Sequence, residues 1–187
     1  MARKNVNVIE VDEVVVKFAG DSGDGMQLSG SQFSDTSAFA GNDLSTFPDY
    51  PSEIRAPQGT LAGVSGFQVQ IGHKAVQTPG DYADVLVALN PAALKANMKW
   101  VKPGATIIID IDNFDNKFYK KAGYIEDPLG DGSLTGYNVV KAPITQMSKA
   151  SIRDIGLDSK SAERTRNQFA LGILYWLFNK DIKFGEE

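Results

Sequence analysis

The sequence contains no cysteine. This absence excludes disulfide bonds, cysteine-ligated zinc, iron–sulfur ligation and catalysis by a thiol. If the protein works in a redox system, the chain itself therefore cannot hold an iron–sulfur cluster.

Histidine and positive charge are also scarce. His73 is the single histidine, and its place after Gly72 at a strand end favours an exposed turn residue over a catalytic base. With a single histidine in such a position, the sequence offers no base for a Ser–His–Asp catalytic triad. The net charge of −4 and the pI near 5.1 argue against a nucleic-acid partner.

Long apolar runs are missing as well. No stretch approaches the roughly 20 apolar residues of a membrane span, and the segment Met1–Asn7 lacks the apolar core of a signal peptide. We therefore expect a soluble, cytoplasmic protein. A length of 187 residues with 42% hydrophobic content predicts a single domain over residues 1–187.

Apolar, β-branched runs alternate with helical patterns along the chain. Predicted strands lie at Val14–Phe18, within Leu61–Ile71, at Asp84–Leu89, at Ala105–Asp110 and at Tyr137–Ala142, and predicted helices at Gln27–Phe39, from Pro91, at Phe114–Ala122 and at Ser161–Leu177. Lys102–Gly104 is predicted to be a turn. Gly41–Thr60 is predicted to be a long, extended surface loop stiffened by prolines, which is called the excursion below. This alternation predicts an α/β fold, a three-layer α/β/α sandwich with a mostly parallel central sheet.

Three glycines within six residues follow the first strand. Gly20, Gly23 and Gly25 precede a predicted helix, an arrangement typical of a phosphate-binding turn whose N–H groups point at an anion. The loop is neither a G-x-G-x-x-G motif nor a Walker loop. Asp21 and Asp24 would repel a phosphate unless they face away or bond within the turn, and a plain strand-to-helix turn is the alternative interpretation.

Other polar residues can be interpreted in two ways. Arg55, in the proline-rich excursion, could bind a phosphate through two parallel N–H donors, or it could form an ion pair with Glu53. Thr60 could add a hydroxyl group. Asn90, after a strand and before Pro91, could contact a ligand, although capping of the next helix is favoured.

Two further groups of polar residues are interpreted without a ligand, and one apolar surface is assigned to a partner. Asp110 and Asp112 are expected to cap a helix rather than bind magnesium. Lys160, Arg164 and Arg166 are expected to form the solvated face of the last helix. Phe47 and Tyr50 form an apolar surface that we expect to pack on a partner subunit, with a lid over the ligand as the alternative.

Three stretches carry a family resemblance. They are Phe18–Gly25, Tyr50–Gln68, which includes Glu-Ile-Arg-Ala-Pro-Gln-Gly-Thr ending at Thr60, and Ala83–Asn90. Together they resemble the gamma domain of the 2-oxoacid:ferredoxin oxidoreductases, and most closely the form fused ahead of the alpha portion in 2-oxoglutarate (2-oxoacid) ferredoxin oxidoreductases. Stand-alone members more often read Gly-x-Gly-Gly-Gln-Gly, so Asp24 replaces their glutamine. In the fused form the alpha portion would follow Phe184–Glu187, and the sequence leaves open whether this chain is an excised domain or a truncated product.

The resemblance implies a supporting role in a larger enzyme, with 2-oxoglutarate as the expected 2-oxoacid. Coenzyme A would bind at this domain, and the candidate site residues are Gly20, Asp21, Ser22, Gly23, Asp24, Gly25, Arg55, Thr60 and Asn90; no catalytic residue is assigned. Thiamine diphosphate, magnesium and iron–sulfur clusters would lie in the alpha and beta portions, through which ferredoxin is reached in an oligomeric complex. Two alternatives are a structural interaction module without a ligand site and a free-standing enzyme that binds a nucleotide or phosphate.

Overall fold

Six strands form one sheet at the centre of the protein. The computed structural model describes residues 8–53 and 55–181, so the predictions for Met1–Asn7 and Phe184–Glu187 lie outside the described residues. The strands are β1 (Glu13–Asp21), β2 (Asp43–Asp49), β3 (Val64–Gly72), β4 (Ala83–Ala88), β5 (Val101–Asp110) and β6 (Asn138–Ala142). Their order across the sheet is β2-β3-β1-β4-β5-β6.

The sheet is mostly parallel, as the sequence predicts. The pairs β1–β4, β4–β5 and β5–β6 are parallel, whereas β3 is antiparallel to both β1 and β2. Because β1 and β2 both run against β3, they end at the same edge of the sheet. The loops that follow β1, β2, β4 and β5 therefore all emerge at this carboxyl edge.

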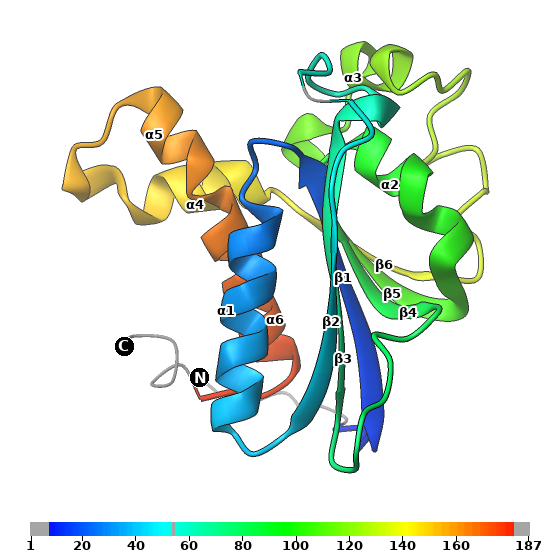
Figure 1. The fold of residues 1–187 in the computed structure, drawn as a ribbon. Helices are drawn as coiled ribbons and strands as arrows, with labels where there is room; N and C mark the ends of the chain where they lie inside the picture. Colours follow the sequence, from blue (N-terminus) through cyan, green and yellow to red (C-terminus); the bar gives the residue numbers. More distant parts are fainter. Residues whose placement is uncertain (1–7, 54, 182–187) are drawn as a thin grey trace.

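Helices cover both faces of the sheet and complete the predicted three layers (Figure 1). The α-helices are α1 (Met26–Phe39), α2 (Pro91–Asn97), α3 (Asn116–Lys121), α4 (Ile144–Ser151), α5 (Ser159–Arg164) and α6 (Arg166–Leu177); short 3₁₀ turns are η1 (Leu61–Gly63), η2 (Met98–Trp100), η3 (Ile111–Asn113) and η4 (Arg153–Ile155). In Figure 1, α1 and α6 lie on one face and α2 on the other, while α4 and α5 project away from the sheet.

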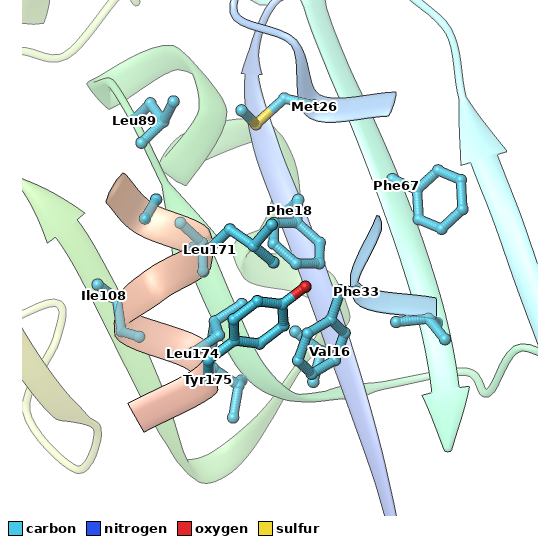
Figure 2. Close-up of a cluster of buried hydrophobic side chains, with 14 of the residues drawn as sticks. Val16, Phe18, Met26, Phe33, Phe67, Leu89, Ile108, Leu171, Leu174 and Tyr175 are labelled. Atoms are coloured by element: carbon cyan, nitrogen blue, oxygen red, sulfur yellow. The ribbon is translucent and has the colours of Figure 1, made fainter. Parts of the chain in front are cut away.

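The hydrophobic core is divided by the sheet into two clusters. Figure 2 shows the cluster under α1 and α6. There the Phe33 ring contacts the Phe18 ring edge-on, with 5.8 Å between the ring centroids, and stacks on the Tyr175 ring, with 6.1 Å between the centroids. The second cluster lies under α2 and α3 and includes Leu94 and Ile107. The strands β4 and β5 contribute to both clusters, which explains why their sequences are almost continuously apolar.

Two segments predicted as loop or turn are strands in the structure. Residues Asp43–Asp49, inside the predicted excursion, form β2 at the edge of the sheet. Pro48 is tolerated there because an edge strand has one side without a ladder partner. Lys102–Gly104, predicted as a turn, belongs to β5, and the register against β4 shifts between Ala83 and Val85.

The C-terminal helical region also differs from the prediction. Ser161–Leu177 was expected to be one helix, but α5 and α6 are separated at Thr165, and α4 was not predicted. The buried side of α6 contains Leu171 and Leu174, whereas Leu177 at its end is 41% exposed. Within the described ranges, no helix combines the length and the apolar character that a membrane crossing requires.

Two helical glycines differ sharply in the space around them. A Cβ atom added at Gly30 in α1 would lie 2.2 Å from the Phe67 ring, whereas one added at Gly172 in α6 would meet nothing within 4 Å. The close approach of α1 to β3 therefore depends on the missing side chain at Gly30.

We predict opposite effects for alanine at these two glycines. Gly30→Ala should destabilise the protein by about 1–3 kcal/mol through overpacking, even though alanine favours helix. Gly172→Ala should be neutral or stabilising by up to about 1 kcal/mol. Denaturant midpoints measure both effects, and equal midpoints for the two variants would contradict the packing argument.

Candidate site at the carboxyl edge of the sheet

The candidate site lies at the carboxyl edge of the sheet, between two neighbouring parallel strands whose following helices lie on opposite faces. The helix after β1 covers one face and the helix after the neighbouring strand β4 covers the other (Figure 1). Ligands of open α/β sheets bind outside the carboxyl ends of the strands at such a switch point. The glycine loop after β1 and Asn90 after β4 both lie there.

The glycine loop is a tight turn whose shape requires glycine at two positions. Gly25 has a φ of 73°, and a Cβ atom there would lie 2.3 Å from the side-chain nitrogen of Asn167. A Cβ atom at Gly20 would lie 2.8 Å from a carboxylate oxygen of Asp24. Ser22 and Gly23 are exposed at the tip. Among the described residues, no side chain caps the first turn of α1, which leaves its N–H groups available to an anion.

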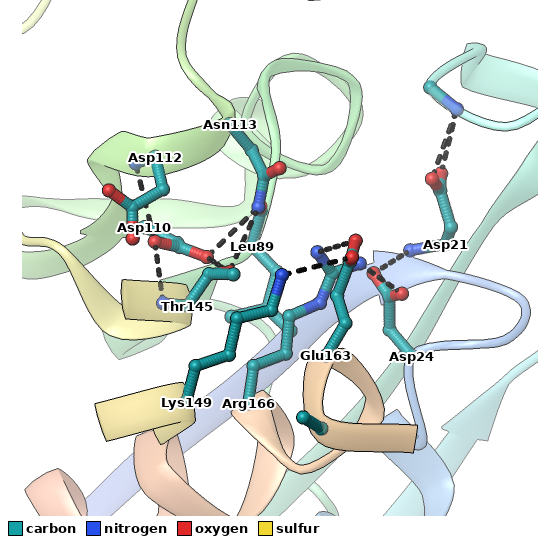
Figure 3. A network of polar contacts seen from close by, with 12 residues as sticks. Asp21, Asp24, Leu89, Asp110, Asp112, Asn113, Thr145, Lys149, Glu163 and Arg166 are labelled. Atoms are coloured by element: carbon teal, nitrogen blue, oxygen red, sulfur yellow. Dashed lines mark hydrogen bonds and ion pairs between the residues drawn. The ribbon is translucent and has the colours of Figure 1, made fainter. Parts of the chain in front are cut away.

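Asp24 points into the protein rather than toward a ligand. One oxygen accepts a hydrogen bond from the Asp21 N–H at 2.9 Å, and the other forms an ion pair with the Arg166 guanidinium of α6. Both side chains are 6% exposed. The expected solvated face is therefore wrong for Arg166, which instead joins the last helix to the glycine loop (Figure 3).

Asp21 also faces away from the tip of the loop. Its two oxygens accept the Gly59 N–H at 3.0 and 3.2 Å. Burial, and then the neighbouring Asp24, raise the pKa of Asp21 above its ordinary value, against the lowering effect of the Gly59 hydrogen bond. Figure 3 shows the Asp21 and Asp24 carboxylates pointing to different partners, so the turn avoids the predicted repulsion of a phosphate.

Arg55 is brought beside the glycine loop. A pocket of about 500 Å³ is lined by Ser22, Tyr50, Pro51, Arg55 and Ala56. Within residues 8–53 and 55–181, the Arg55 guanidinium forms no ion pair or hydrogen bond, so the alternative pairing with Glu53 is not formed there; only the Arg55 N–H contacts the Glu53 carbonyl, at 3.2 Å. The Arg55 φ of 136° is unusual for a residue other than glycine.

Thr60 and Asn90 are engaged within the fold. The Thr60 hydroxyl donates to the Pro57 carbonyl at 2.7 Å. The Asn90 Oδ1 atom accepts the Ala93 N–H at 2.8 Å and caps α2, which confirms the favoured interpretation. The Asn90 Nδ2 atom is buried and makes no hydrogen bond to any described residue.

Asp110 caps the next helical turn, η3, as expected, by accepting the Asp112 N–H at 3.3 Å, and both aspartates also hold N–H groups in the first turn of α4. Asp110 accepts hydrogen bonds from the Thr145 N–H and hydroxyl at 3.2 and 2.5 Å, and Asp112 accepts the Gln146 N–H at 2.7 Å (Figure 3). The described part of the chain contains no group of three acidic or histidine side chains that could hold a metal ion. His73 lies exposed after β3, as predicted.

Sequence reasoning missed Arg166 as a residue of the site. A signal was present in the spacing, because Arg166, Ala170 and Leu174 recur every four residues and share the buried side of α6. An arginine in such a series is expected to meet a buried acidic partner. The partner, Asp24, is 142 residues earlier in the chain, so local pattern could not identify it.

The geometry defines a three-layer α/β domain with a glycine-loop pocket at the switch point of its sheet. The chain belongs to the pyruvate ferredoxin/flavodoxin oxidoreductase family, whose model matches residues 15–185. The family resemblance predicted from the sequence is thus confirmed.

Individual relatives agree with this membership. The chain is 46% identical over 176 residues to the 2-oxoglutarate oxidoreductase subunit KorA of Mycobacterium tuberculosis, which covers 94% of this chain and 27% of the relative. The chain therefore spans about a quarter of the length of that curated relative.

Solved structures share the fold. A 2-oxoglutarate:ferredoxin oxidoreductase from Magnetococcus marinus, with 2-oxoglutarate, coenzyme A and succinyl-CoA bound, matches with a TM-score of 0.68 and 24% identity over 94% of this chain and 26% of that one. The gamma subunit of a keto/oxoacid ferredoxin oxidoreductase from Geobacter sulfurreducens matches with a TM-score of 0.64 and 20% identity over 94% of this chain and 82% of that subunit.

We predict that the Asp24–Arg166 pair is a major source of stability. Arg166→Met should cost about 3–5 kcal/mol, because it leaves the buried Asp24 carboxylate without its partner. The matched control is Lys102→Met, which breaks the exposed pair with Asp84 and should cost no more than about 1 kcal/mol. Urea unfolding measures both, and similar losses would show that burial of the pair is unimportant.

We also predict a pH dependence from Asp110. Burial raises the pKa of Asp110 above 3.8, so the native state binds more protons than the unfolded state between 3.8 and the raised value. The free energy of unfolding of the wild type, relative to Asp110→Asn, should therefore increase as the pH falls through this window. Hydrogen bonds from Ser161 lower the pKa of Asp158, so Asp158→Asn should show the opposite trend. Unfolding at several pH values tests both signs.

Proposed function

We propose that residues 1–187 form the gamma-type domain of a 2-oxoacid:ferredoxin oxidoreductase, with 2-oxoglutarate as the 2-oxoacid, and that the domain binds coenzyme A. Family membership and the similarity to KorA support the enzyme class. The observation that carries the ligand assignment is the pocket lined by both Ser22 and Arg55, whose guanidinium makes no ion pair with residues 8–53 and 55–181.

The pocket suits the diphosphate of coenzyme A. A guanidinium binds phosphate through two parallel N–H donors, and Ser22, which carries a hydroxyl group, lines the same pocket as Arg55. The first turn of α1 follows the glycine loop, and among the described residues no side chain caps it. A volume of about 500 Å³ accommodates part of coenzyme A and leaves the rest of the ligand outside. The apolar side of Tyr50, which is 70% exposed, supplies a surface for that remainder.

The predicted site residues divide into two groups in this proposal. Ser22, Gly23, Gly25 and Arg55 present groups to the ligand. Gly20, Asp21, Asp24, Thr60 and Asn90 shape the turn and the loop, because their polar groups or their lack of a side chain serve contacts inside the protein. The negative charges of Asp21 and Asp24 are thereby kept out of the pocket.

The chemistry of decarboxylation and electron transfer belongs elsewhere in this proposal. The chain has no cysteine, and its described residues contain no metal-binding group, so thiamine diphosphate, magnesium and iron–sulfur clusters are assigned to the alpha and beta portions of a cytoplasmic, oligomeric complex that reduces ferredoxin. When bound there, these groups would carry out the oxidation of the 2-oxoacid. This domain would hold and orient the acyl acceptor, and we expect it to be inactive alone.

A structural interaction module is the second candidate. Phe47 on the edge strand and Tyr50 are both well exposed, which fits contact with a partner subunit. Tyr50 lines the pocket and Phe47 does not, so the predicted apolar surface is divided between a ligand-facing and a partner-facing residue. A free-standing enzyme is the weakest candidate, because the described residues assemble no nucleophile with a base.

We predict that Arg55→Ala weakens coenzyme A binding by roughly 1.5–3 kcal/mol, the value of a charged hydrogen bond. Isothermal titration of the chain at low ionic strength measures this loss, with NAD as the control ligand. Arg153→Ala, which removes an exposed arginine on η4, is the matched control and should leave binding unchanged. Equal binding by the wild type and Arg55→Ala would exclude the pocket as the phosphate site.

A further inference from the structure

The loop that carries Arg55 is fixed at Gly59 from two sides. The Gly59 N–H donates to both oxygens of Asp21 at the end of β1. On the opposite side, a Cβ atom at Gly59 would lie 3.1 Å from the Phe118 ring of α3, and the Lys121 ammonium group donates to the Gln58 carbonyl at 3.1 Å. Gly59 therefore sits between the sheet edge and α3.

Asp21 is well placed to set the geometry of the pocket. It directly precedes Ser22, whose N–H donates to the Gly63 carbonyl at 3.0 Å. The two hydrogen bonds, from Gly59 to Asp21 and from Ser22 to Gly63, join the glycine loop to the end of the Arg55 loop. The short segment formed by Asp21 and Ser22 thus holds the glycine loop and the Arg55 loop together, and these two loops are the walls of the pocket.

Asn90 provides a second donor near the same carboxylate. Its Oδ1 atom is held by the Ala93 N–H, which fixes the orientation of the amide group, and the residue is 2% exposed. Its Nδ2 atom makes no hydrogen bond among the described residues. The parallel pairing of β1 with β4 places Ala19 opposite Ala88, so Asp21 and Asn90 lie at neighbouring strand ends. Asn90 acts to lower the pKa of Asp21, against the larger raising effect of burial, and a buried donor gains free energy from a nearby acceptor.

We propose that Asp21 and Asn90 are positioning residues of the coenzyme A pocket. Asp21 holds the Gly59 N–H, and with it the loop that places Arg55 opposite Ser22, while Asn90, at the end of the neighbouring strand β4, offers the Asp21 carboxylate a second donor. The same arrangement turns the negative charge of Asp21 away from the pocket. The inference rests on the proposed function for its ligand but not for its geometry.

Amide hydrogen exchange tests the geometry without any ligand. In Asp21→Asn, the Gly59 amide should exchange at least several-fold and up to roughly 150-fold faster, because a neutral amide oxygen replaces the charged carboxylate acceptor. The Leu89 amide, which bonds the Ala19 carbonyl at 3.0 Å in the core, is the internal reference and should not change. Unchanged exchange at Gly59 would overturn the proposal.

Two further variants separate positioning from general damage. Asn90→Asp keeps an oxygen for the Ala93 N–H but replaces the donor by a second carboxylate, so it should also accelerate exchange at Gly59; it takes the place of Asp21→Asn if that variant does not fold. Asp158→Asn, at the cap of α5, makes the same chemical change away from the Arg55 loop and should leave Gly59 unaffected. Faster exchange in Asp158→Asn equal to that in Asp21→Asn would contradict the specific role of Asp21.

Coenzyme A titration then connects the geometry to the pocket. If positioning matters, Asp21→Asn should bind coenzyme A at least about tenfold more weakly, although it removes a negative charge. Faster exchange at Gly59 with equal or tighter binding would overturn the positioning role. Failure of the wild type to bind coenzyme A would instead refute the proposed function, while the exchange data would still decide whether Asp21 holds the loop.

Discussion

The buried ion pair between Asp24 and Arg166 is the contact on which the rest of the site depends. It joins the glycine loop after the first strand to the last helix, and both side chains are almost completely removed from solvent. A buried charge without its partner is strongly destabilising, so neither segment can take its position without the other. The pair also turns one acidic side chain of the loop inward, which leaves Ser22 and Gly23 at the surface.

Other carboxylates along the carboxyl edge of the sheet also bind groups from distant parts of the chain. Asp21 holds the Gly59 N–H, Asp110 holds Thr145, and Asp112 holds the N–H of Gln146. Each carboxylate at or near a strand end fixes a donor from a distant segment. The acidic residues at this edge are therefore largely committed to internal hydrogen bonds. The charged residue that lines the pocket is Arg55, which forms no ion pair with the described part of the chain.

Much of the fold could be predicted from periodicity, whereas contacts between distant segments could not. The buried strands β4 and β5, the helix after Pro91 and the mostly parallel sheet follow from apolar runs and turn residues. The strand β2 was missed because Pro48 is compatible with a strand only at a sheet edge, and edge position is a property of the whole fold. The sequence predicts a ligand site at the glycine loop and Arg55, and Ser22 and Arg55 do line one pocket, but the inward roles of Asp21 and Asp24 depend on Gly59 and on Arg166. No local pattern contains those partners.

The separation of Asp24 from Arg166 has a consequence for biosynthesis. The two residues are 142 positions apart, so in a chain made from its N-terminus the glycine loop leaves the ribosome long before its cationic partner exists. The strands and α1 can begin to associate as they appear, but the loop cannot reach its final form until α6 has been synthesised and packed. The pocket beside the glycine loop is thus one of the last parts of the domain to mature, and a chain interrupted before α6 would carry an incomplete pocket.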